Sequence, residues 1–366
     1  MGLRCGIVGL PNVGKSTLFN ALTNAGAEAS NFPFCTIDPN IGVVGVPDPR
    51  LSVLSDIVKP GKTTKTSLEV VDIAGLVKGA SEGKGRGNAF LSHIRQVDLI
   101  LHVVRCFEDE NVVHVEDGVD AIRDIRTIED ELILKDLETV EKREEKLLNQ
   151  AKGRDKEVIR DLETVRALRE FIETGRRARD FPHSEAIGDV LRDLFLLSEK
   201  PVIYVCNVSE DEVSGAQKNA EVPRVREYAE RSGDEVIIVS ARIEAEISEL
   251  EGDEREAFLG ELGLSDSGLN RLVNCTYSNL GLITYFTVGP KEVRAWTIRR
   301  GTKAPQAAGV IHTDFERGFI RAETISYDDY VTEGSEHMAR EAGKMRLEGK
   351  DYEVCDGDVM FFRFNV

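Results

Sequence analysis

The sequence predicts an α/β protein with a mainly parallel sheet, followed by a separate small α+β domain. Continuous apolar runs of about six residues alternate with helical or glycine-rich segments, a pattern typical of strands that are covered on both faces. A glycine-rich turn lies between the first apolar run and the first helix, as in nucleotide-binding α/β folds. The length of 366 residues allows two or three domains and a core that needs neither disulfides nor metals to fold.

The expected elements of the first domain follow the apolar runs. Strands are predicted at residues 3–8, 41–46, 68–73, 99–104, 202–205 and 236–239, and a helix is predicted at residues 15–25. Between residues 122 and 200 the chain is highly charged and carries apolar residues at steps of three and four, which predicts an inserted antiparallel helical hairpin. Such an arm either braces the domain or docks a partner.

The second domain begins where short strand-like segments replace this pattern. They lie at residues 283–288, 294–298, 319–325 and 359–364, around one short helix at 305–311. We therefore expect a nucleotide-type domain over residues 1–280, with the helical insertion at 122–200, and a small α+β domain over 281–366.

Composition excludes several classes of protein. Hydrophobic residues make up 41% of the chain and charged residues 31%, and no apolar run approaches the roughly 20 residues that a bilayer requires. The N-terminus lacks a secretory signal, so we expect a cytoplasmic location and no membrane partner. Six scattered cysteines predict neither a disulfide framework nor a zinc site. The formal charge of −18 means that RNA must be met by a local basic patch, and no DNA partner is expected.

Residues 9–16, Gly-Leu-Pro-Asn-Val-Gly-Lys-Ser, match the phosphate-binding loop G-x-x-x-x-G-K-[ST] (the P-loop) between a strand and a helix. The glycines let successive backbone N–H groups face the phosphates, the helix N-terminus adds its positive dipole, and Lys15 supplies a cation. Lys15 is therefore a candidate catalytic residue, and Ser16 a candidate Mg²⁺ ligand. The predicted phosphate-binding residues are Asn12, Val13, Gly14, Lys15, Ser16 and Thr17.

Two further segments complete a predicted Mg²⁺ and γ-phosphate site. Asp72 and Gly75 form a D-x-x-G motif at the end of a predicted strand, where ligands of open α/β sheets bind. Asp72 is expected to orient a water on Mg²⁺, and the N–H of Gly75 to meet the γ-phosphate. Thr36 offers a loop hydroxyl as a third metal-site residue, although it is also explained as an ordinary turn threonine. The glycine-rich residues 76–88 are expected to order around the nucleotide.

These motifs resemble those of the Obg-like ATPase (YchF) family of P-loop proteins of the translation-factor class. The match includes Asn-Phe-Pro-Phe-Cys-Thr-Ile at residues 31–37, Asp-Ile-Ala-Gly-Leu-Val-Lys-Gly-Ala at 72–80 and the C-terminal Asp-Gly-Asp-Val-Met-Phe-Phe-Arg-Phe-Asn-Val, and thus spans the chain. The resemblance implies a Ras-like P-loop nucleotide domain, a helical-hairpin (coiled-coil) insertion and a C-terminal TGS domain of β-grasp type. It also implies ATP hydrolysis and association with the ribosome.

Base recognition is predicted from Asn207-Val208-Ser209-Glu210, which stands where guanine-specific relatives have Asn-Lys-x-Asp. The longer acid is misplaced for guanine, and an unpaired buried polar group costs about 1–3 kcal/mol, enough to change base preference. Adenine offers an amino group that the side chain of Asn207 or a backbone carbonyl near Val208 can accept, so ATP is expected over GTP. The alternative is that Glu210 reads guanine after a small shift.

Catalysis departs from the common pattern because Leu76 occupies the position at which many GTPases carry the water-orienting Gln, so intrinsic hydrolysis should be slow. Resemblance points to His114 as the replacement, since a neutral imidazole can position water. Asn12 also occurs in relatives that K⁺ stimulates, which makes K⁺ a candidate second ion beside Mg²⁺.

Partners are predicted from the C-terminal domain. It carries a candidate basic face with interleaved aromatic residues, made of Lys291, Arg294, Trp296, Arg299, Arg300, Lys303, Arg317, Phe319 and Arg321. Similarity to TGS domains implies contact with RNA or the ribosome, either its large subunit or the whole particle. The sequence therefore favours an ATP-hydrolysing switch at the ribosome, with a GTPase translation factor and a nucleotide-sensing scaffold as alternatives.

Overall fold

The computed structural model describes residues 3–24, 40–73, 86–109, 118–182, 190–214 and 219–365. The chain packs as two compact units, one made of Met1–Val43 and Glu69–Arg271 and the other of Val44–Leu68 and Leu272–Val366. Our expected domain limits differ from these units in residues 44–68 and 272–280. The reason for the first difference is packing: Leu51 and Leu54 are buried in a cluster with residues of the C-terminal sheet, which no local sequence pattern reveals.

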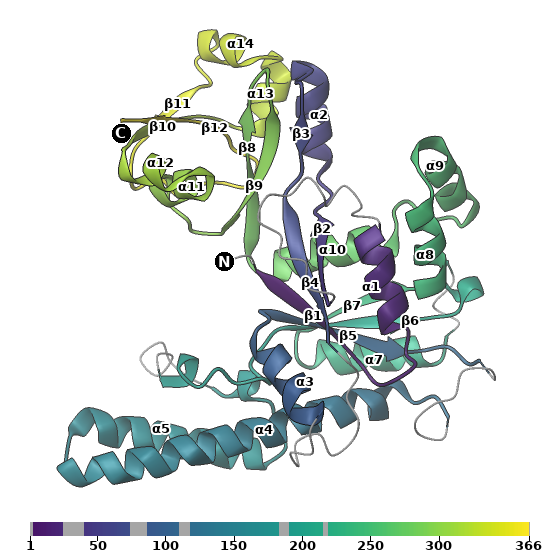
Figure 1. Cartoon of the computed structure of the whole chain (residues 1–366), viewed down its shortest axis with the longest axis vertical. Helices are drawn as coiled ribbons and strands as arrows, with labels where there is room; N and C mark the ends of the chain where they lie inside the picture. Colours follow the sequence, from purple (N-terminus) through teal and green to yellow (C-terminus); the bar gives the residue numbers. More distant parts are fainter. Residues whose placement is uncertain are drawn as a thin grey trace. The chain divides into compact units, whose positions relative to one another are not determined.

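The first sheet has the strand order β2-β4-β1-β5-β6-β7 (Figure 1). Its strands are β1 (Arg4–Val8), β2 (Ile41–Gly45), β4 (Ser67–Asp72), β5 (Leu99–Arg105), β6 (Val202–Asn207) and β7 (Glu235–Val239). The neighbours β4, β1, β5, β6 and β7 are all parallel. Every residue of β5 and β6 is buried, so the continuous apolar runs correctly predicted central strands that are covered on both faces.

Helices cover this sheet, and the loops between strands and helices lie at its carboxyl edge. They are α1 (Lys15–Asn24), α3 (Arg86–Arg95), α7 (Glu221–Glu230), α8 (Ala241–Glu249), α9 (Gly252–Glu261) and α10 (Gly268–Asn279), with short 3₁₀ turns η4 (Ala178–Asp180) and η5 (Glu210–Glu212). Helix α1 packs against α8, whereas the first part of α4 (Ala121–Gln150) contacts β5 and α7. The loops after β1, β5, β6 and β7 therefore meet at one edge, where ligands of such sheets bind.

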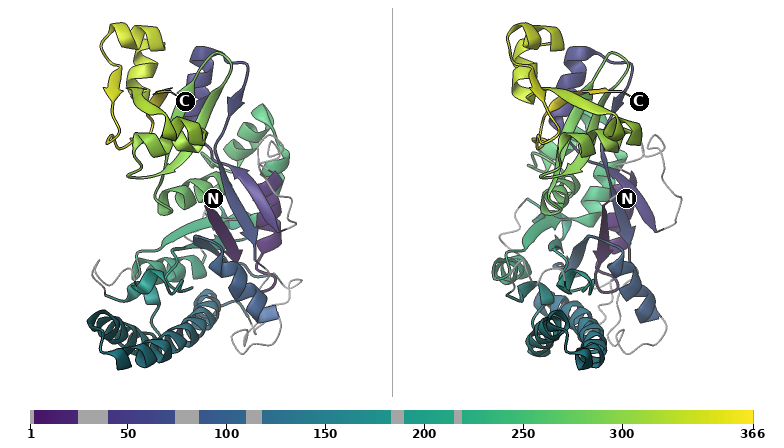
Figure 2. Two further views of the ribbon diagram at one scale, coloured as in Figure 1. Left: turned by 60° about the vertical axis from the view of Figure 1, so that its left-hand side comes forward. Right: turned by 90° about the vertical axis from the view of Figure 1, so that its left-hand side faces the viewer.

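The predicted helical hairpin is present and forms an arm of residues 121–173 (Figures 1 and 2). It consists of α4, the turn η3 (Ala151–Gly153) and α5 (Lys156–Glu173). Its seam buries Val140 and Leu147 of α4 against Val165 and Leu168 of α5. Apolar residues nearer the start of α4, such as Ile125, lie outside this cluster, because that half of α4 packs on the sheet.

The second sheet has the order β11-β10-β12-β8-β9-β3. Its strands are β3 (Thr63–Thr64), β8 (Leu282–Val288), β9 (Val293–Arg299), β10 (Phe319–Ile325), β11 (Arg346–Glu348) and β12 (Val359–Phe364). Its helices are α2 (Pro49–Val58), α11 (Ala304–Ile311), α12 (Thr313–Arg317), α13 (Tyr327–Glu333) and α14 (Glu336–Glu341). Two buried clusters flank the sheet, one including α2 and α13 and the other α11, so the expected mixed α+β architecture is confirmed.

Membrane insertion has no support in the helices that the structure describes. None of them is both long and apolar enough to cross a bilayer.

Candidate functional site

The P-loop forms the first wall of a cleft. It leaves β1 at Val8 and enters α1 at Lys15, and its backbone turns through left-handed conformations at Asn12 (φ 63°) and Gly14 (φ 98°). A Cβ atom at Gly14 would collide with the side-chain amide of Asn207. Glycine is therefore required at position 14 both for the backbone angle and for close packing.

Lys15 is held within the curl of the loop. Its Nζ donates to the carbonyl of Leu10 at 2.7 Å, and the residue is 9% exposed. Burial lowers the pKa of the Lys15 ammonium, and the carboxylate of Asp72 acts in the opposite direction. Burial likewise raises the pKa of Asp72, against the effect of Lys15. Lys15 and Asp72 are thus partly buried charges. An anion placed beside Lys15, or a cation placed beside Asp72, would therefore interact favourably with it.

Asp72 and Ser16 fit the requirements of a Mg²⁺ site. Asp72 ends β4, the strand next to β1, and its Oδ1 is buried without a hydrogen-bond partner among the described residues. Ser16 lines the cleft and is exposed. No group of three His, Cys, Asp or Glu side chains that could cage a metal occurs in the described part of the chain. This donor set suits Mg²⁺, which keeps several waters and takes its other oxygens from phosphates.

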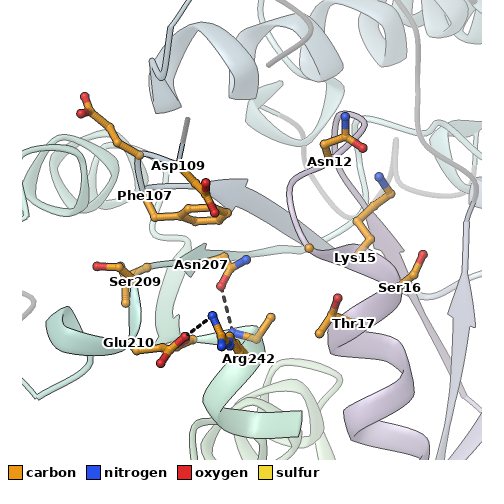
Figure 3. A pocket seen from close by; sticks show the side chains of 15 residues that line it. Asn12, Lys15, Ser16, Thr17, Phe107, Asp109, Asn207, Ser209, Glu210 and Arg242 are labelled. Atoms are coloured by element: carbon orange, nitrogen blue, oxygen red, sulfur yellow. Dashed lines mark hydrogen bonds and ion pairs between the residues drawn. The ribbon is translucent and has the colours of Figure 1, made fainter. Parts of the chain in front are cut away.

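The cleft has a volume of about 570 Å³, within the range of nucleotide-sized pockets (Figure 3). It is lined by the carboxyl-edge segments after β1, β5, β6 and β7, namely Asn12, Gly14, Lys15, Ser16, Thr17, Phe107, Glu108, Asp109, Asn207, Val208, Ser209, Glu210, Ser240, Ala241 and Arg242. Segments separated by more than 200 residues thus form one site.

Asn207 joins two walls of the cleft. Its Nδ2 donates to the carbonyl of Val13 at 2.9 Å, and its Oδ1 accepts from the N–H of Ala241 at 2.9 Å (Figure 3). The residue is 4% exposed, and the N–H of Val208 is used by the carbonyl of Val239. The side chain of Asn207 therefore fixes the P-loop against the start of α8, a role that the motif alone did not reveal.

Glu210, which stands where guanine-specific proteins carry their base-reading aspartate, has a partner in the protein. Its Oε1 lies 2.8 Å from Nη1 of Arg242, across the cleft floor (Figure 3). Both side chains are substantially exposed, at 47% and 76%, so the pair is a weak interaction by itself. The pair turns the Glu210 carboxylate toward Arg242.

Phe107 was missed by sequence reasoning. It follows β5 after Cys106, and its side chain lines the cleft close to Asn207 (Figure 3). Arg105 holds it in place: the guanidinium lies 4.7 Å from the ring centroid, and its Nε donates to the carbonyl of Phe107 at 3.1 Å. A half-buried aromatic residue at a strand's carboxyl end is a signal that could have identified this wall.

Asn219, also missed, connects the walls of the cleft at the end formed by Phe107 and the Asn207 loop, which we call the base end because residues 207–210 stand at the base-recognition position of the sequence motif. Its Nδ2 donates to the carbonyl of Cys106 at 2.6 Å and to Oε2 of Glu212 at 2.9 Å, and Glu212 in turn accepts from the hydroxyl of Ser209 at 2.8 Å. Its Oδ1 accepts from the N–H groups of Glu221 and Val222 at the start of α7. One buried amide therefore holds the residue before Phe107, the Ser209 loop and α7 together.

The predicted site residues fall into two groups. The residues that line the cleft are Asn12, Gly14, Lys15, Ser16, Thr17, Asn207 and Val208. The carbonyl of Val13 accepts a hydrogen bond from Asn207, and Asp72 ends the neighbouring strand β4. Thr36, Gly75, Leu76 and His114 lie outside the described residues, so their predicted roles stay predictions.

Comparison with known proteins gives full-length matches. A protein of *Bacillus subtilis* (strain 168), "Ribosome-binding ATPase YchF", is 57% identical over 366 residues and 100% of both chains. The chain belongs to the YchF family. The *Escherichia coli* O157:H7 protein of the same name is 54% identical over 100% of both chains, and "Obg-like ATPase 1" of *Rattus norvegicus* is 47% identical over 99% of this chain and 92% of its own.

Family models and a solved structure agree with membership of the YchF family. Residues 4–159 match the model described as "50S ribosome-binding GTPase", and residues 282–365 match the one described as "Protein of unknown function (DUF933)". The *Schizosaccharomyces pombe* YchF GTPase structure superposes with a TM-score of 0.91 at 41% identity, over 99% of this chain and 98% of that one. The expected fold class is thus confirmed: a Ras-like P-loop domain with a helical-hairpin insertion and a C-terminal β-grasp (TGS) domain.

Proposed function

We propose that this protein is an ATP-hydrolysing nucleotide switch that associates with the ribosome. The nucleotide part rests on one observation, the composition of the cleft. The P-loop lysine Lys15 lies at one end of it, and at the other end Glu210, which stands where guanine-specific proteins carry an aspartate, is paired with Arg242. Support for the ribosomal part comes from full-length relatives that are named ribosome-binding ATPases.

ATP is proposed as the preferred nucleotide because the base end lacks a free acceptor pair for guanine. Glu210 is longer than the aspartate it replaces and points to Arg242, so it is misplaced for guanine N1–H and the guanine amino group, whereas adenine needs only one acceptor for its amino group. Oδ1 of Asn207 keeps a second lone pair after accepting from Ala241. Phe107 would stack on either base, so it contributes affinity without discrimination.

The proposed reaction is attack of a water molecule on the γ-phosphoryl group in line with the departing ADP oxygen. Lys15 would neutralise charge that develops on the phosphate oxygens, and the P-loop N–H groups would hold those oxygens in place. Ser16, Asp72 and the proposed ligand Thr36 would hold Mg²⁺, which would supply further positive charge to the phosphate oxygens. K⁺ beside Asn12 is part of the same proposal, and replacing K⁺ by Na⁺ in the assay tests it.

His114 is proposed to orient the attacking water, because Leu76 cannot hydrogen-bond one. His114→Ala should lower kcat about 10- to 100-fold and leave ATP affinity nearly unchanged. His93→Ala, which removes an exposed histidine of α3, is the matched control. A normal kcat for His114→Ala would remove this residue from the mechanism.

RNA contact through the C-terminal domain is the finer part of the ribosomal proposal. Lys291, Arg299 and Arg300 are exposed, and the guanidinium of Arg294 stacks 3.9 Å from the centroid of Trp296. Such cation and aromatic groupings suit single-stranded RNA. We propose a cytoplasmic location to match this partner.

The deciding experiment is a competition of ATP and GTP against one fluorescent nucleotide, with and without ribosomes. The proposal expects ATP to bind about ten- to a hundredfold more tightly. Tighter binding of GTP would instead favour a GTPase, the activity named for the matched family model and the *S. pombe* relative. Ribosome co-sedimentation with an ATP analogue, with ADP and without nucleotide tests the switch, and equal binding in all three states would reject it.

A further inference from the structure

The arm changes sign along its length. Residues 124–141 of α4 contain seven acidic and two basic residues, whereas residues 142–160, which we call the arm tip, contain seven basic and four acidic residues. The arm tip therefore carries a local charge of +3 on a chain of −18. A positive end on an otherwise acidic protein concentrates its attraction for anionic polymers at one place.

The cations nearest the turn of the arm tip differ from those farther along the arm in their partners. Lower on the arm, Lys135 pairs with Glu138 at 2.7 Å, and Arg166 and Arg169 both pair with Glu144, at 2.8 and 2.9 Å. Lys146, Arg154 and Lys156 are exposed, and none has a carboxylate within 4.0 Å in the described part of the chain. Lys152 is exposed, and its Nζ donates to the amide oxygen of Asn149 at 3.0 Å.

Some acidic residues of the arm tip have partners in the protein. The side chain of Glu144 is 14% exposed and is neutralised by two arginines, and the carboxylate of Asp155 accepts from the N–H of Glu157 at the start of α5. Lys142 and Arg160 in turn lie 4.0 and 3.8 Å from Glu138 and Asp161, which are outside the arm tip, so the charge that faces solvent there stays close to the sequence count of +3.

The turn presents these cations from a rigid support. Buried Val140 and Leu147 pack against Leu162 and Val165 below it, and Arg154 closes the turn in a left-handed conformation (φ 59°). Helix α4 has 30 residues and is therefore roughly 45 Å long. Because its first half packs on the sheet, its second half carries the tip away from the sheet (Figure 2).

The composition of the arm tip favours one class of partner. Residues 142–160 contain no aromatic residue or histidine, so the tip offers no stacking platform for bases, and its lysines and arginines suit phosphate oxygens. We propose that the arm tip, through Lys152, Arg154 and Lys156, binds the phosphate backbone of ribosomal RNA without reading its sequence. This inference rests on the proposed association with the ribosome and names a surface for it.

The test compares two triple charge reversals. The tip variant is Lys152→Glu, Arg154→Glu, Lys156→Glu, and the control is Arg126→Glu, Arg226→Glu, Arg231→Glu, which changes net charge equally at exposed sites outside both the arm tip and the C-terminal domain. Glutamate at position 156 lies at the start of α5, where the helix dipole favours it, so the tip variant should fold. ATP hydrolysis without ribosomes, which checks the cleft, should be unchanged in both.

Affinity is measured for ribosomes by co-sedimentation and for purified ribosomal RNA, each across a salt series. The tip variant should bind both at least about tenfold more weakly, and its slope of log affinity against log salt should be shallower by about 2 to 3, as expected for three lost phosphate contacts. The control should stay within about twofold of wild type, because scattered charges make no local phosphate contacts.

Equal affinity of the tip variant and the control would overturn the proposal. Loss of ribosome binding without any tip-dependent binding to the purified RNA would also overturn it, and would point to an acidic protein surface instead. If wild type failed to co-sediment with ribosomes yet bound RNA through the tip, the inference would stand while the ribosomal part of the proposed function fell. Binding to neither would remove both.

Discussion

The two ends of the cleft are built in different ways. The phosphate end comes from one continuous segment, residues 9–17, and depends on backbone geometry at Asn12 and Gly14. The base end is assembled from Phe107, the Asn207 loop and Arg242, which lie in three separate segments. It is held by side-chain hydrogen bonds that span 113 and 194 residues of sequence, from Asn219 and from Asn207.

The phosphate end has the general task of binding any nucleoside triphosphate, whereas the base end has the specific task of selecting a base. Every nucleoside triphosphate has the same phosphates, so the phosphate end needs only N–H groups and one cation. Selection of a base requires donors and acceptors at defined positions, which here depend in part on Asn219, a residue that does not line the cleft. Changes at the phosphate end should therefore affect all nucleotides alike, whereas changes at the base end should alter affinity or preference.

The largest expected effect is that of Lys15→Ala. Removal of the buried ammonium leaves phosphate charge without its cation, so hydrolysis of ATP and of GTP should both fall at least about a hundredfold. Lys62→Ala removes an exposed cation and serves as the control. Steady-state rates with both nucleotides measure the effect, and a loss confined to one nucleotide would contradict the division between the two ends.

Phe107→Ala is expected to weaken ATP and GTP binding about tenfold, since one aromatic stack contributes about 1–3 kcal/mol. The kcat at saturating ATP should stay near that of wild type, because the phosphate end is untouched. Phe107→Tyr keeps the ring and should restore affinity. Titration of a fluorescent nucleotide provides the measurement; unchanged affinity in Phe107→Ala would show that the base does not lie against this residue.

Two substitutions of Asn219 distinguish an effect on the position of the cleft residues from an effect on protein stability. Asn219→Ser keeps a short oxygen that can cap α7 but loses the donors to Cys106 and Glu212, so ATP affinity should fall about fivefold or more with only a modest change in Tm. Asn219→Ala loses both functions, so its Tm should fall further. Thermal melts and nucleotide titrations distinguish them, and full affinity in Asn219→Ser would reject the positioning role.

The smallest effect is expected for Arg242→Ala, because an exposed ion pair contributes only about 0–1 kcal/mol. Release of the Glu210 carboxylate should shift the ATP-to-GTP affinity ratio toward GTP by about two- to fivefold. Arg242→Lys, which keeps the charge, should preserve the ratio. In the double variant with Glu210→Ala the shift should disappear, whereas its persistence there would mean that Glu210 is not the group released.

Much of the fold was predictable because its signals are local. The buried strands β5 and β6 show as continuous apolar runs, and the arm shows as 3- and 4-residue apolar steps in charged sequence. Local signals did not reveal that α2 packs with the C-terminal sheet or where the arm's seam begins along α4. Both depend on which surface a helix meets, and the same amphipathic pattern fits either surface.

For the site, the sequence by itself determined the phosphate end, since glycine spacing fixes the backbone turn and places Lys15 and Ser16 at the start of a helix. Only the tertiary structure decided the base end. There, parallel strands bring Phe107, Asn207 and Arg242 to one edge, and Asn219 ties that edge together. The physical reason is that a backbone cradle depends on the angles of neighbouring residues, whereas a side-chain pocket depends on where distant strands end.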